Sequence, residues 1–138
     1  RGGAAPRLGL GGEARGRRGA ANPLGQLGRA LGRALPEAHR RFLGSLRLQH
    51  EEGEYFFAHA GVRPGVPLDK QAARDLLWVR EPFLNSAGDF GKVVVHGHTP
   101  QPGVEERPNR VGIDTGAVTG GPLTALVLEG GARRFLYA

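Results

Sequence analysis

The chain of 138 residues is long enough for one small domain with one hydrophobic core. It contains no Cys, which excludes disulfides and thiolate metal sites, so a metal would have to be held by His and carboxylate side chains. The sequence has neither a run of about 18 apolar residues nor an apolar secretory signal, and it begins with Arg1 rather than Met. We therefore expect a cytoplasmic protein, without a membrane partner, whose true start lies upstream.

The positive charge lies at one end of the chain. The net charge is +6, yet residues 1–48 carry ten Arg and two Glu, whereas residues 49–138 carry more acidic than basic residues. A basic segment is typical of nucleic-acid binding, but residues 1–33 contain no aromatic side chain on which a base could stack. We therefore expect no nucleic-acid partner except through this basic segment, whose deletion would abolish such salt-dependent binding.

Residues 1–33 consist mostly of Gly, Ala, Arg and Leu, a composition that buries too little apolar surface to offset the entropy of ordering the chain. We predict that this segment is disordered or is translated from a wrong reading frame, and that the domain proper covers residues 34–138. Four Leu residues nevertheless recur at helical spacing near its end, which indicates a weak helix there: Leu24, Leu27, Leu31 and Leu35.

The next predicted elements are a helix, a strand and a second helix. Pro36 and Glu37 suit the first turn of a helix, and apolar residues then recur on one face, which predicts a helix over 36–46. The short apolar and aromatic run over 54–60 predicts a strand. Residues 69–79 have a helical pattern, and Pro82 limits the continuation of that helix.

Four strands are predicted after this helix, over residues 92–96, 110–113, 123–128 and 133–137. Glu129-Gly130-Gly131 between the last two is typical of a hairpin turn. The order of helix, strand, helix and four strands favours half of an α/β layered sandwich over a helical bundle.

Two His residues occupy positions that suit a metal site. His59 follows the strand predicted over 54–60, and His98 follows the strand predicted over 92–96. Open α/β sheets place their sites at the carboxyl ends of strands, and a neutral imidazole is a good ligand for first-row metals. A single His at a strand end is more often a surface or hydrogen-bonded residue, so the pattern by itself leaves both interpretations open.

Four sequence blocks occur in a fixed order, and together they resemble the second half of the bacterial phosphoprotein-phosphatase type of calcineurin-like metallophosphoesterases. The blocks are His59-Ala60-Gly61, Leu77-Trp78-Val79-Arg80-Glu81, Val95-His96-Gly97-His98-Thr99-Pro100 and Ile113-Asp114-Thr115-Gly116-Ala117. The resemblance runs from about Leu35 to Tyr137. It implies an α/β fold, the four-layer metallophosphoesterase β-sandwich with flanking helices, of which this chain would be the carboxy-terminal half.

The resemblance also implies roles for individual residues. His59 and His98 match the His ligands of the family's second metal. Arg80 matches a catalytic Arg that binds the substrate phosphate, which suits a planar guanidinium; the alternative is a surface Arg paired with Glu81. His96 is expected in the second shell of the metal. Asp114, also a second-shell candidate, would either orient a ligand or hold its own turn, and we favour the turn.

One position distinguishes branches of this superfamily. Many metallophosphoesterases carry a second His in a Gly-His-x-His block, where this chain has Pro100. The departure points to the phosphoprotein-phosphatase branch and therefore to a serine/threonine protein phosphatase, with a phosphorylated protein or a small phosphoester as substrate. A bis(5'-nucleosyl)-tetraphosphatase-like hydrolase is the alternative on the same site, and a non-catalytic relic with a basic nucleic-acid-binding tail is a further one.

The family's chemistry is hydrolysis by water that two divalent ions activate. The resemblance implies Mn²⁺ as the preferred cofactor, with Fe or Zn as alternatives. The family's first half supplies Asp-x-His, Asp-Arg-Gly and Asn-His-Glu blocks, and none is present here, because no Asp precedes Asp69. We therefore predict that the chain is a fragment with no meaningful phosphatase activity and with incomplete folding on its own.

Overall fold

The computed structural model describes residues 23–138, so the predictions about residues 1–22 lie outside the described residues. The chain divides into two units, and the second comprises Leu46–Ala138. The first contains α1 (Pro23–Ala34) and α2 (Glu37–Ser45). Helix α2 agrees with the helix predicted over 36–46. Helix α1 falls where the Leu spacing indicated a weak helix, so residues 23–33 differ from the disorder predicted for them.

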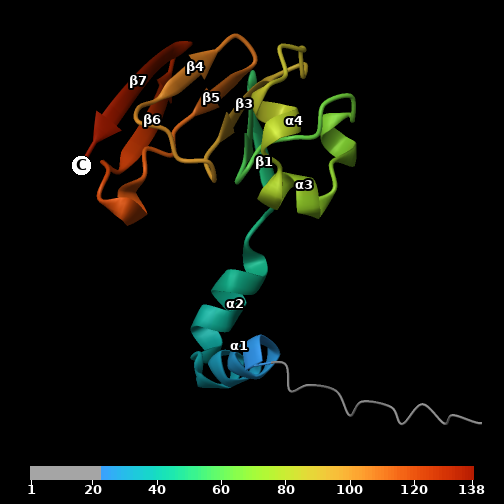
Figure 1. The fold of residues 1–138 in the computed structure, drawn as a ribbon, viewed down its shortest axis with the longest axis vertical. Helices are drawn as coiled ribbons and strands as arrows, with labels where there is room; N and C mark the ends of the chain where they lie inside the picture. Colours follow the sequence, from blue (N-terminus) through green and yellow to red (C-terminus); the bar gives the residue numbers. More distant parts are fainter. Residues whose placement is uncertain (1–22) are drawn as a thin grey trace, which may run out of the picture. The chain divides into compact units, whose positions relative to one another are not determined.

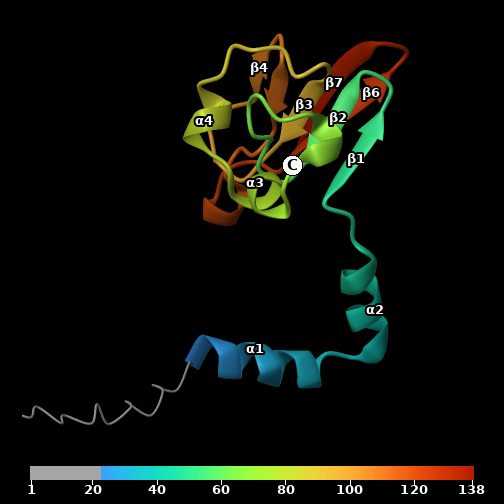
Figure 2. The ribbon, with the colours of Figure 1, turned by 90° about the vertical axis from the view of Figure 1, so that its right-hand side faces the viewer.

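The second unit is built on a sheet of five strands among the described residues, in the order β1-β2-β3-β5-β4. The central strands are β2 (Tyr55–Ala58), β3 (Val93–His96) and β5 (Arg110–Gly112), and they run parallel to one another. The edge strands β1 (Gln49–Glu52) and β4 (Glu105–Arg107) are antiparallel to their neighbours. Figure 2 shows β1 beside β2.

Two short helices cover one face of this sheet (Figure 1). They are α3 (Ala73–Trp78) and α4 (Glu81–Leu84). The helix predicted over 69–79 is thus interrupted: a 3₁₀ turn spans Leu68–Lys70, and α3 begins only at Ala73. Pro82 lies in the first turn of α4, where the missing N–H leaves no helical hydrogen bond unmade.

The hydrophobic core lies between these helices and the sheet. Its buried members come from β2, β3, the helices and the segment after β2: Phe56, Ala60, Val62, Leu76, Val79, Phe83 and Val94. Phe56 and Val94 are register partners and therefore point to the same face. Burial of these apolar side chains is the main stabilising contribution to the unit.

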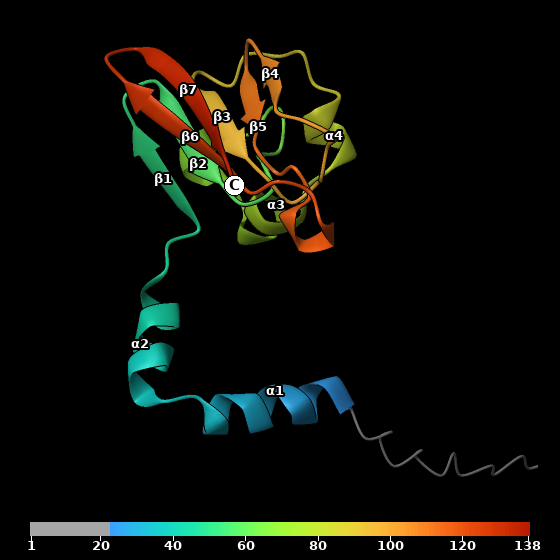
Figure 3. The ribbon, with the colours of Figure 1, turned by 90° about the vertical axis from the view of Figure 1, so that its left-hand side faces the viewer.

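The last two strands, β6 (Thr124–Glu129) and β7 (Ala132–Tyr137), form the predicted hairpin. Its two-residue turn has positive φ at Gly130 (52°) and Gly131 (82°), the geometry that matches the twist of paired strands. The hairpin lies against the face of the large sheet opposite to α3 and α4 (Figures 1 and 3). No helix within residues 23–138 is long and apolar enough to cross a membrane.

Candidate metal and phosphate site

The three parallel strands end at the same edge of the sheet. His59 follows β2, His98 follows β3 and Asp114 follows β5. The backbone N–H of Gly97 donates to the carbonyl of His59 at 2.9 Å, which ties the ends of β2 and β3 together. A Cβ on Gly97 would lie 3.4 Å from the Cβ of Asp114. The small residue between the two His of β3 therefore permits the close approach of the three strand ends.

His59 and His98 face each other across this edge. Nε2 of His59 lies 3.1 Å from Nδ1 of His98, and the ring centroids are 4.9 Å apart. The Trp78 ring meets His98 edge-on at 5.5 Å. The sequence blocks included Trp78 without giving it a role, and its place beside Arg80 in one block was the signal that could have associated it with the site.

The backbone of His98 is held in an uncommon conformation. Its φ is 67°, and the N–H of Thr99 donates to the carbonyl of Gly97 at 2.8 Å, so His98 is the central residue of a γ-turn. This turn is rare and strained for a residue with a side chain. Such strain is concentrated at functional sites in proteins, because the surrounding structure must enforce it.

The electrostatic surroundings keep His98 neutral. Burial lowers the pKa of the His98 imidazole, and the positive charges of Arg80 and His59 lower it further, while Asp114 acts in the opposite direction. Nε2 of His98 is buried without a hydrogen-bond partner among the described residues. A neutral imidazole has a free lone pair, which is the form that binds a metal.

Arg80 is exposed at the start of α4, and its guanidinium makes no ion pair or hydrogen bond with any described side chain. Its neighbour Glu81 instead accepts a hydrogen bond from Asn85 at 2.7 Å. The alternative of an Arg80–Glu81 surface pair is therefore not formed. A free guanidinium close enough to influence His98 is available to bind an anion.

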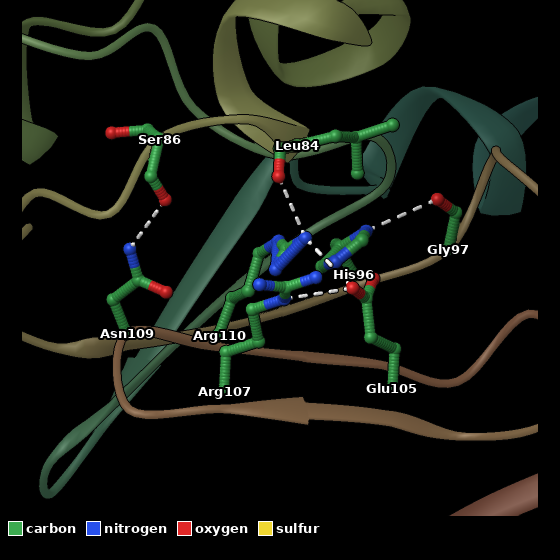
Figure 4. A network of polar contacts seen from close by, with 8 residues as sticks. All are labelled: Leu84, Ser86, His96, Gly97, Glu105, Arg107, Asn109 and Arg110. Atoms are coloured by element: carbon green, nitrogen blue, oxygen red, sulfur yellow. Dashed lines mark hydrogen bonds and ion pairs between the residues drawn. The ribbon is translucent and has the colours of Figure 1, made fainter.

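His96 and Asp114 have other surroundings. The His96 side chain is buried on the helix-covered face, edge-on to the Phe83 ring at 4.8 Å, next to the network drawn in Figure 4. Oδ1 of Asp114 accepts a hydrogen bond from the N–H of Gly116 at 3.1 Å, so this carboxylate holds its own turn. A second-shell role of either residue stays a prediction.

An open groove of about 540 Å³ lies beside the His pair, between the large sheet and the start of β6. Its apolar lining includes Phe57, Val95, Ile113 and Leu123, and the two His residues also border it. Sequence reasoning did not predict this groove, because its walls come from segments that are far apart along the chain.

The metal that the resemblance implies fits the described residues only in part. Two imidazole nitrogens 3.1 Å apart are compatible with both binding one ion at about 2.0–2.1 Å. Within residues 23–138, however, no group of three or more His, Asp or Glu residues could hold a metal ion. The described residues therefore offer two ligands for one ion and do not build a two-metal centre.

Comparisons with known proteins bear on the fold. No family model and no curated protein matches the sequence. A solved crystal structure described as a "putative diadenosine tetraphosphatase" matches with a TM-score of 0.64 and 24% sequence identity. The match covers 83% of this chain but 61% of the other, so this chain spans well under two thirds of that protein. The chain therefore has an α/β fold similar to that of a metallophosphoesterase over the matched region.

Proposed function

We propose that this chain contributes the His59–His98 part of a metal-dependent phosphoesterase site, and that the complete site hydrolyses a dinucleoside polyphosphate. The observation that carries the proposal is the pair of imidazoles at adjacent strand ends, 3.1 Å apart, in a fold shared with a protein described as a tetraphosphatase. The serine/threonine protein phosphatase activity rests on the sequence blocks alone and is therefore the second candidate.

Arg80 would bind a phosphate group of the substrate. It is exposed, has no partner among the described side chains, and lies close enough to influence His98. A dinucleoside polyphosphate carries several negative charges, and each charge-assisted hydrogen bond from a guanidinium contributes about 1.5–3 kcal/mol. The remaining metal ligands would come from residues outside 23–138, so we assign no catalytic step to the described residues alone.

The metal-binding part of the proposal is tested by titrating Mn²⁺, and separately Zn²⁺, into the purified chain by calorimetry. We expect weak binding of one ion, because two neutral imidazoles leave its charge uncompensated. The substitutions His59→Ala and His98→Ala should each abolish it. His39→Ala, which removes an exposed imidazole from α2, should leave it unchanged. Binding that survives His98→Ala would show that the ion lies elsewhere.

The substrate class is tested by equilibrium binding in the presence of Mn²⁺. We expect diadenosine tetraphosphate to bind more tightly than a phosphoserine peptide, and Arg80→Ala to weaken the tetraphosphate by about 10–100-fold, the loss of one charged hydrogen-bonding group. Arg134→Ala, an exposed Arg on β7, is the matched control. Preference for the phosphopeptide would instead favour the protein phosphatase.

A further inference from the structure

The β6–β7 hairpin covers only part of the sheet face on which it lies. Nε of Arg133 donates to the Tyr55 hydroxyl at 2.9 Å, and the guanidinium lies 5.3 Å from the centre of the Tyr55 ring, so this side of the hairpin faces the large sheet. Side chains alternate along a strand, which places Phe135 and Tyr137 on the same inward side. Tyr137 is nevertheless 60% exposed. The second layer is therefore incomplete where the hairpin ends (Figure 3).

The groove of about 540 Å³ is a second sign of this incomplete layer. It separates Phe57 and Val95 of the large sheet from Leu123 and Thr124 at the start of β6. Protein interiors are packed as densely as organic crystals, with few voids larger than a water molecule. An apolar gap between two layers of strands is thus the space that side chains of a further strand would fill.

The free edge of β6 borders this groove. Leu123 and Ala138 exchange both backbone hydrogen bonds, at 2.9 and 3.0 Å. In an antiparallel pair such residues alternate with pairs whose N–H groups point away from the partner. The amides of Thr124, Leu126 and Leu128 therefore point away from β7, and no strand within residues 23–138 lies beside them. A row of unpaired amides is a template for another strand.

We propose that this edge and the groove receive one β-strand from a further polypeptide segment, which completes the second layer of the sandwich. The occupant corresponds to the part of the solved tetraphosphatase that this chain does not span, since the match covers 61% of that protein. Its backbone pairs with β6, and its inward side chains are apolar because the groove walls are apolar. The inference deepens the proposed function and rests on it, because the same segment would bring the missing ligands to the His pair.

A second copy of this chain does not fit as the occupant. The side chains that β6 could offer inward are Thr124, Leu126 and Leu128, which already face the chain's own sheet. They cannot at the same time enter the groove of another copy. The strand must therefore come from a segment whose apolar side is still free.

The experiment is amide hydrogen exchange by NMR on the full ¹⁵N-labelled chain. The probe is an unlabelled polypeptide consisting of the part of the solved tetraphosphatase outside the matched region. In the chain alone, the amides of Leu126 and Leu128 should exchange much faster than that of Val127, which pairs with β7. With the probe, we expect a complex in which the Leu126 and Leu128 amides become protected at least 10-fold.

Two variants distinguish strand pairing from other contacts. Leu126→Pro removes an outward-pointing donor at an edge where proline is tolerated, so it should leave the hairpin intact and abolish the complex. Leu126→Ala removes the same side chain but keeps the donor, so it should retain protection of Leu128. Equal binding by both variants would overturn the inference, as would absence of a complex or a complex whose β6 edge stays unprotected. Protection that appears in the chain alone and rises with its concentration would also overturn it, in favour of self-association.

The outcome also separates this inference from the proposed function. A complex with a protected β6 edge that does not hydrolyse diadenosine tetraphosphate with Mn²⁺ would leave the strand pairing in place and remove the activity. Hydrolysis by a complex whose Leu126 and Leu128 amides still exchange freely would do the reverse.

Discussion

Glu105→Ala should destabilise the second unit more than any other removal of a surface carboxylate. Arg110 is 1% exposed, and its guanidinium donates to Oε1 of Glu105 at 3.0 Å and to the carbonyl of Leu84 at 2.8 Å (Figure 4). Burial lowers the pKa of Arg110, and the charge of Glu105 acts in the opposite direction. Without Glu105, a buried cation has no carboxylate partner among the described residues.

The size of the effect follows from the geometry. Removing one partner of a fully buried ion pair costs about 3–5 kcal/mol, because the other charge stays buried and unpaired. The Glu105 side chain is 27% exposed, so water can partly replace it, and we expect about 2–3 kcal/mol. Since a denaturant slope of about 1–3 kcal/mol per molar urea is usual for small domains, the urea midpoint should fall by about 1–2 M.

Two further variants test the reasoning. Glu106→Ala removes the neighbouring carboxylate, which is 50% exposed and 3.6 Å from Arg133, and should cost less than about 1 kcal/mol. The double variant Glu105→Leu with Arg110→Met removes both charges and should be more stable than Glu105→Ala. The argument fails if the two single variants lose equal stability, or if the double variant is the least stable of the three.

Other predictions concern a close contact, an ion pair and the activity of the chain alone. A Cβ at Gly61 would overlap the Phe83 ring, so Gly61→Ala should lower the free energy of unfolding by about 1–3 kcal/mol or more, whereas Gly65→Ala, also at positive φ but in open space, should cost less in the same urea titration. A hydrogen bond from Arg63 holds the pKa of Asp75 below its usual range. The ionised carboxylate thus stabilises the fold above the usual aspartate pKa, and this contribution is lost as the pH falls through the lowered pKa, so Asp75→Asn should be less stable than the parent at neutral pH and equal to it in strong acid. The purified chain should not sustain metal-dependent hydrolysis of p-nitrophenyl phosphate in a colorimetric assay, because the described residues supply only two ligands; turnover that depends on added Mn²⁺ would contradict this.

Local patterns were sufficient for several elements. The Val93-Val94-Val95 run predicted β3, and Gly130-Gly131 predicted the hairpin turn, because β-branching and positive φ are properties of single residues and their neighbours. The edge strands β1 and β4 were not predicted. They are short and charged, with the sequences QHEE and EER, and they exist because a neighbouring strand supplies their hydrogen bonds.

The sequence by itself determined which residue types stand at strand ends, and so it named His59 and His98 as candidates together. Only the tertiary structure brought them within 3.1 Å, since they are 39 residues apart and meet through the parallel register of β2 and β3. The same register turned His96 toward Phe83 and the other face of the sheet. The groove and the free β6 edge likewise depend on which layers pack together, a long-range property that no local pattern contains.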